Sequence, residues 1–168
     1  LYEKASELNL PICIHAGNGS NEMKSLLFRQ DLFFYGVTPV LAAFNALVTG
    51  GIPQRFPKLR FGFVETGAQW VPYLIREAIR RRQRINTPGE IADETTAMKD
   101  LRLFVACRTD DDLPYILRWA GEDNLLIGTD FGHEDPAAEL EALSNLGKKG
   151  DVDPAVVQKM LADNARAF

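Results

Sequence analysis

The chain has 168 residues, of which 46% are hydrophobic and 25% charged, as expected for a globular protein of about one domain. Its net charge of −4 argues against nucleic acid or an anionic membrane surface as a general partner. It has no apolar run near the roughly 18 residues of a membrane span and no signal-peptide pattern, so we expect neither a membrane protein nor a secreted one.

Four short apolar segments, rich in β-branched and aromatic residues, predict β-strands. Near-continuous apolar runs of this kind are typical of strands buried on both faces. Helix-like segments separate them, and this alternation is the order of βα units in a parallel sheet. The predicted strands are Pro11–Ile14, Leu59–Val64, Leu103–Ala106 and Leu125–Thr129.

Helices are predicted between and around these strands. Leu1, Ala5 and Leu8 recur at helical spacing, and a chain that starts with Leu inside a helix leads us to expect sequence upstream. Three later helices should start where an N-cap residue precedes proline. These starts are Thr38-Pro39, Asp135-Pro136 and Asp153-Pro154; further helices follow Trp70 and Leu113, and the predicted stops are Gly50-Gly51, Gly121 and Gly147.

Residues 17–36 and 86–100 do not fit this pattern and are predicted to be long loops, each with room for a short helix. Both cysteines, Cys13 and Cys107, lie in predicted strands, where we expect them to pack as small core residues. A disulfide would need adjacent strands and an oxidising compartment, so we favour a cytoplasmic location.

Each predicted strand runs into a polar residue that could carry chemistry. These residues are His15, Glu65, Arg108 and Asp130. The carboxyl ends of parallel strands meet at one edge of a sheet, where sites are built. We therefore expect the four side chains to converge, and a His, a Glu and an Asp together indicate a metal-assisted site.

Each candidate also has a structural alternative. His15 could be a metal ligand or a core histidine, and Asp130 a ligand or a cap and turn residue. Glu65 could be a ligand, a general base, or an ion-pair partner of Arg108 or Arg60. Arg108 could bind a substrate carboxylate in a bidentate fork or pair with Asp110, Asp111, Asp112 or Glu65. His133 could face the substrate or pack in a turn.

Several motifs resemble those of the amidohydrolase-2 family, the branch of the metal-dependent amidohydrolases that includes aminocarboxymuconate-semialdehyde decarboxylase. Leu10–Gly17 is similar to its fifth-strand motif and Arg55–Phe61 with Glu65–Pro72 to its sixth. Ile127–His133 is similar to its eighth-strand motif, and Asp163–Arg166 to its closing helix. The resemblance covers essentially all residues 1–168.

The resemblance implies a TIM (β/α)₈ barrel of the amidohydrolase type, of which this chain supplies about strands 5–8 as one incomplete domain. It implies a divalent metal, zinc first with manganese or iron as alternatives, held by His15 and Asp130. From the residues themselves, beside the resemblance, we expect Asp130 and Glu65 to be catalytic and Arg108 and His133 to bind the substrate.

Three departures from the family pattern limit what is carried over. The His-x-His pair of the family's first strand is absent, since the chain has only His15 and His133. Glu65 stands where decarboxylase members carry a catalytic His, which puts decarboxylation in doubt. Gly132 replaces the usual Pro, a minor change.

The function that results is a metal-dependent hydrolase or lyase, with decarboxylation as one option, acting on a small carboxylated or cyclic substrate. A catalytic zinc site needs three protein ligands, so further ligands would have to come from sequence outside the chain. The alternative is an inactive barrel fragment or interaction scaffold. A phosphate- or nucleotide-binding protein ranks lower because no Gly-rich phosphate loop follows a strand. The open edges of a half barrel would favour a homo-oligomer.

Overall fold

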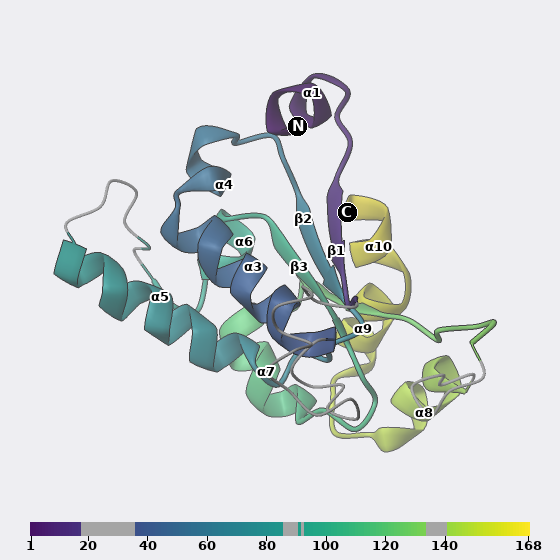
Figure 1. The fold of residues 1–168 in the computed structure, drawn as a ribbon. Helices are drawn as coiled ribbons and strands as arrows, with labels where there is room; N and C mark the ends of the chain where they lie inside the picture. The colour runs from purple at the N-terminus through teal and green to yellow at the C-terminus, as the bar shows by residue number, and fades with distance from the viewer. Residues whose placement is uncertain (18–35, 86–90, 92, 134–140) are drawn as a thin grey trace.

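Four parallel strands form the centre of the fold in a computed structural model, which describes residues 1–17, 36–85, 91, 93–133 and 141–168 (Figure 1). The strands pair in the order β1-β2-β3-β4. Their parallel pairing and the helices between them confirm the predicted α/β architecture. The strands are β1 (Ile12–His15), β2 (Phe61–Val64), β3 (Leu103–Cys107) and β4 (Leu125–Ile127).

Helices precede, separate and follow the strands. Among the described residues, none is both long and apolar enough to cross a membrane. The helices are α1 (Tyr2–Glu7), α3 (Thr38–Thr49), α4 (Ile52–Arg55), α5 (Val71–Ile85), α6 (Ala97–Asp100), α7 (Leu113–Ala120), α8 (Ala142–Lys149), α9 (Pro154–Gln158), the π-helical segment η2 (Lys159–Asp163) and α10 (Asn164–Ala167).

The two faces of the sheet have different cover. Figure 1 shows α3, α5 and α7 on one side of the sheet and the C-terminal helices on the other. On the first side, Phe63 of β2 packs edge-on against Phe44 of α3, with ring centroids 5.1 Å apart. Both side chains are fully buried. On the other side, Phe104 of β3 lies 5.2 Å from the ring of Phe168.

The prediction that every strand is buried on both faces is wrong for β1. Its residues alternate between half-buried and exposed, and Cys13 is exposed, whereas Cys107 on β3 is buried. The reason is position, because β1 pairs only with β2 in the described sheet and is an edge strand. Cys13 is therefore not the core residue we predicted. Neither cysteine forms a disulfide within the described residues.

Two predicted helix boundaries need correction. Thr38 is the first residue of helix α3 and not its N-cap. The N-cap position falls to Val37, whose backbone angles are already helical. Helix α8 runs through Gly147 to Lys149 and stops at Gly150, whose φ of 71° is the left-handed geometry that suits glycine at a helix end. The predicted start at Asp135-Pro136 lies outside the described residues.

Other predicted boundaries are confirmed. Helix α3 ends at Gly50 and α7 at Gly121, and the Asp153 side chain caps α9 by accepting the Ala155 N–H at 2.7 Å. The second of the two long connections contains the short helix α6. Most of the first connection, residues 18–35, lies outside the described residues.

The C-terminal helices are anchored at the amino end of β4. The buried Asn164 donates to the backbone oxygens of Glu122 and Leu125, at 2.8 and 2.7 Å. Lys159 of η2 pairs with Glu122 and Asp123, and hydrogen bonds to these two carboxylates raise the pKa of Lys159. Hydrogen bonds from Lys159 and Lys99 in turn lower the pKa of Asp123. The anchors lie at the opposite end of β4 from Asp130, which leaves the carboxyl end of the sheet free to form a site.

Candidate active site at the carboxyl ends of the strands

The polar residues predicted at the strand ends all lie at one edge of the sheet. His15 is the last residue of β1, Glu65 follows β2 directly, Arg108 follows β3 directly, and Asp130 follows β4 after two residues. The parallel pairing of the strands puts these positions side by side. Together with His133, they line a cavity of about 400 Å³.

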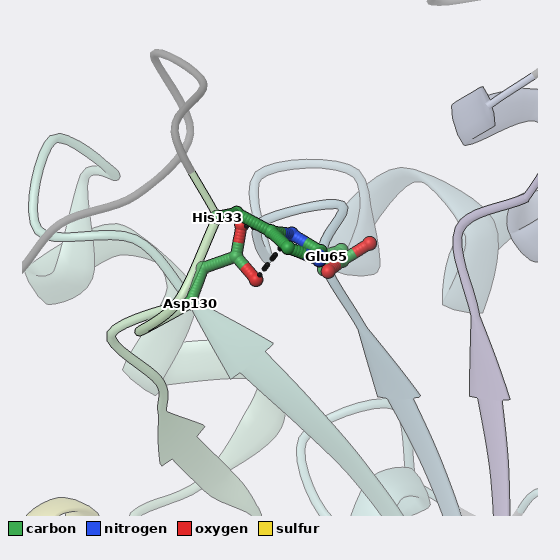
Figure 2. Close-up of side chains that lie close together, drawn as sticks. All are labelled: Glu65, Asp130 and His133. Atoms are coloured by element: carbon green, nitrogen blue, oxygen red, sulfur yellow. Dashed lines mark hydrogen bonds and ion pairs between the residues drawn. The ribbon is translucent and has the colours of Figure 1, made fainter.

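The structure brings Glu65, Asp130 and His133 together as a possible ligand group. One potential ligand atom from each lies within 4.8 Å of the others. Figure 2 shows Glu65 and Asp130 just beyond their strands and His133 on the loop after Asp130, with a hydrogen bond between Asp130 and His133. The Nδ1 atom of His133 lies 3.0 Å from a carboxylate oxygen of Asp130. The sequence left open whether His133 faces the substrate or supports another site residue, and its contact here is with Asp130.

His15 approaches this cluster through Glu65. Its Nε2 atom lies 3.0 Å from Oε1 of Glu65, and its Nδ1 faces the carbonyl oxygen of Ala16. A carbonyl oxygen only accepts hydrogen bonds, so Nδ1 must carry a proton and Nε2 is the nitrogen presented to the site. With Nδ1 protonated, Nε2 of His15 and Oε1 of Glu65 are two hydrogen-bond acceptors that face each other. A proton or a cation between them would remove their mutual repulsion.

The two carboxylates are the less accessible members of the site. The side chains of Glu65 and Asp130 are 28% and 20% exposed, against 57% for His15 and 60% for His133. The acceptors thus lie toward the floor of the site, and the imidazoles lie nearer the solvent. A negatively charged floor beneath accessible imidazoles suits a cation that enters from solvent.

Both carboxylate residues have left-handed backbone geometry, with φ of 64° at Glu65 and 51° at Asp130. Such angles are uncommon for residues other than glycine, asparagine and aspartate, and they cluster at functional sites. At each strand end, the left-handed residue breaks the extended backbone as the chain leaves the sheet. The sequence pattern indicated the two positions but not this geometry.

Arg108 contacts the backbone of the neighbouring loop. Its Nη2 donates to the carbonyl oxygen of Glu65 at 3.4 Å, so it does not form the ion pair with the Glu65 carboxylate that we weighed as an alternative. Arg60, the other alternative partner of Glu65, donates instead to Asn9 and to the carbonyl oxygen of Phe168. Arg108 is exposed and lines the cavity, where its remaining donors can meet a bound anion.

Sequence reasoning missed one residue at this edge. Asp111 entered only as a partner for the Arg108 side chain, but its carboxylate is buried and accepts the backbone N–H groups of Ala68 and Arg108. Nothing in the run Asp110-Asp111-Asp112 singles out the middle residue. Gly67 is a residue whose type fits this contact. In the structure it has a φ of 62° and leaves room for the Asp111 carboxylate.

Comparison with known proteins identifies relatives of this architecture. The family model described as Amidohydrolase matches residues 1–168. No curated protein matches the chain.

Solved structures with the same fold are remote in sequence, and each covers 99% of this chain. An amidohydrolase from Mycobacterium avium subsp. paratuberculosis has a TM-score of 0.73 at 20% identity, with 43% of its own chain covered. The 2,6-dihydroxybenzoate decarboxylase from Rhizobium has a TM-score of 0.74 at 16% identity, with 53% covered. A dihydroxybenzoic acid decarboxylase from a Polaromonas species, solved with manganese and 2-nitroresorcinol, has a TM-score of 0.70 at 18% identity, with 51% covered. The chain thus spans about half the length of these structures, and the likeness shows a partial α/β barrel.

The Gly67→Ala variant tests the backbone of the loop that follows Glu65. A side chain at φ 62° is strained, and an added Cβ would lie 3.2 Å from the Asp111 carboxylate. We expect the free energy of unfolding to fall by about 1–2 kcal/mol, measured by urea denaturation. Gly128→Ala is the matched control, because Gly128 lines the same cavity but an added Cβ meets nothing within 4 Å. Equal stability of the two variants would show that the Gly67 backbone is not under this constraint.

Proposed function

The chain belongs to the amidohydrolase family, and on that basis we propose that it carries part of the active site of a divalent-metal-dependent hydrolase or lyase. The substrate class we propose is a small carboxylated or cyclic molecule. The observation that carries the proposal is the convergence of His15, Glu65, Asp130 and His133 on one cavity. We also propose that residues 1–168 are the C-terminal half of a (β/α)₈ barrel, to which they contribute strands five to eight.

The donor atoms of this site fit a divalent cation. Carboxylate oxygens and imidazole nitrogens are ligands that zinc, manganese and iron share. His15 and Asp130 would hold the ion, with the family's His-x-His pair supplying further ligands from outside this chain. The manganese in the Polaromonas structure supports Mn²⁺ as the first ion to test, ahead of the zinc that the sequence suggested. A bound cation would supply Lewis acidity toward a substrate oxygen or a water molecule.

Glu65 is the proposed general base. Its carboxylate lies 3.0 Å from Nε2 of His15 and beside Asp130, where it can take a proton from an attacking water. Asp130 also orients the imidazole of His133 through their 3.0 Å contact. A carboxylate base favours the attack of water on a substrate carbon, which supports hydrolysis or water addition ahead of decarboxylation.

Substrate binding falls to Arg108 and His133. The planar guanidinium of Arg108 can bind a carboxylate with two parallel hydrogen bonds. His133 lies next to Asp130 and is exposed enough to meet a ligand. Mixed polar and apolar walls, which include Val64, Ala106 and Leu126, suit a small organic anion.

Two further expectations accompany this function. A cytoplasmic location stays our expectation from the sequence. The edge strands β1 and β4 each have one neighbour in the described sheet, so the remaining strands of a barrel or a second copy of the chain could pair with them. An inactive scaffold is the competing function, and it predicts no metal binding at this cavity.

Replacement of Asp130 tests the proposed metal site. In the complete protein, which would include the His-x-His pair proposed to lie outside these 168 residues, and with Mn²⁺ supplied, Asp130→Ala should lower turnover of small carboxylated esters, amides and lactones by about 100-fold or more, because a metal ligand is lost. Asp130→Asn keeps the shape and tolerates the left-handed backbone, so it separates the chemistry from folding. Exposed Asp110→Asn is the control. Wild-type turnover by Asp130→Asn would show that the site is assigned wrongly.

Replacement of Glu65 distinguishes a base from a ligand. Glu65→Gln keeps the size of the side chain but cannot take a proton, and we expect kcat to fall by about 10²- to 10⁴-fold. The dissociation constant for Mn²⁺, measured by electron paramagnetic resonance, should change little. A variant that loses Mn²⁺ together with activity would make Glu65 a ligand, and unchanged kcat would exclude it from the chemistry.

A further inference from the structure

Asp111 joins the two loops that carry Glu65 and Arg108. One carboxylate oxygen, Oδ2, accepts the backbone N–H of Ala68 at 2.8 Å and that of Arg108 at 2.9 Å. Ala68 lies in the loop after β2, three residues beyond Glu65, and Arg108 begins the loop after β3. A single acceptor atom therefore fixes the distance between two backbone segments that are 40 residues apart in sequence.

The surroundings of Asp111 are shaped to keep its carboxylate there. The residue is only 8% exposed, and a buried carboxylate is costly unless its oxygens are hydrogen-bonded. Gly67, at φ 62°, brings its Cα so near that a side chain would crowd both carboxylate oxygens. The loop after β2 is thus folded around the carboxylate of the next loop.

Two further contacts strengthen the same junction. The backbone N–H of Asp112 donates to the side-chain oxygen of Gln69 at 2.9 Å, which links the loops a second time. Lys149 of α8 donates to the carbonyl oxygens of Thr109 and Asp111, at 3.1 and 3.0 Å. The segment that follows β4 therefore also holds the loop that contains Asp111.

We propose that Asp111 is a positioning residue that sets where Glu65 and Arg108 stand in the cavity. The inference rests on the proposed function, in which Glu65 is the base and Arg108 the substrate anchor. The Asp111 carboxylate binds backbone N–H groups, and it acts by fixing the backbone at Arg108 and three residues after Glu65. His15 and Asp130 lie on other strand ends, so the ability to bind a cation does not depend on this junction.

Three variants of the complete protein, with the His-x-His pair present, test the proposal. Asp111→Ala removes the shared acceptor. Asp111→Asn keeps an oxygen that can accept both N–H groups, so it is the conservative rescue. Asp110→Ala is the matched control, since it removes the exposed carboxylate of the adjacent residue. Amide hydrogen exchange over residues 65–70 and 107–112, Mn²⁺ affinity, and kcat and KM are measured for each.

In Asp111→Ala we expect amide exchange in both segments to rise by about 10-fold or more, because the hydrogen bonds that closed them are gone. The value of kcat/KM should fall by about 10- to 100-fold, as expected for small displacements of a base and an anchor. Mn²⁺ affinity should stay within about threefold, since lost metal ligation changes affinity by more than that. Asp111→Asn should restore protection and most of the turnover, and Asp110→Ala should resemble the wild type.

Three results would overturn the proposal. Unchanged exchange in both segments would show that Asp111 does not hold the loops. Raised exchange with wild-type kcat and KM would show that the junction is structural only. A parallel loss of Mn²⁺ affinity and turnover would show a general collapse of the site. Failure of the proposed function has a different signature. A complete wild-type protein, with the His-x-His pair present, that binds no Mn²⁺ and is inactive refutes that function, whereas amide exchange in Asp111→Ala still reports on the loops.

Discussion

The parallel direction of the four strands is the constraint on which the site depends. Each strand contributes one polar residue at or just after its carboxyl end, and parallel pairing turns four distant positions in sequence into neighbours. Antiparallel pairing of any one strand would send its polar residue to the opposite edge. The apolar faces of β2 and β3, packed against α3, α5 and α7, hold this direction in place.

On this frame, local backbone geometry converts nearby positions into a site. Left-handed geometry at Glu65 and Asp130 breaks the extended backbone as the chain leaves the sheet, and the two carboxylates come together beside His133. Such geometry is costly for a glutamate and must be held by the surroundings at Glu65. The hydrogen bonds between the loops after β2 and β3, centred on Asp111, are suited to hold it at Glu65. Acceptors held in place before any cation or substrate arrives need little reorganisation when one binds.

The sequence was informative where one residue type dictates local structure and less so where distant segments decide. Apolar runs located all four strands, and Asp153-Pro154, Gly50 and Gly121 correctly marked helix ends. The exposure of Cys13 could not be foreseen because it follows from the edge position of β1. Asp111 could not be separated from its two acidic neighbours, because its partner Ala68 lies 43 residues away. The meeting of Glu65, Asp130 and His133 likewise depends on tertiary packing, although the strand-end positions of the two carboxylates predicted the correct edge of the sheet.

If the strand ends form a divalent-cation site, anomalous diffraction from a crystal of the complete protein, with the His-x-His pair proposed to lie outside these 168 residues, soaked in Mn²⁺ is the most direct way to see it. We expect one strong anomalous peak in the cavity, in contact with Asp130 and with Nε2 of His15, at the edge of the sheet where Glu65 lies. A peak elsewhere on the surface, or an empty cavity at saturating Mn²⁺, would contradict the proposed metal site.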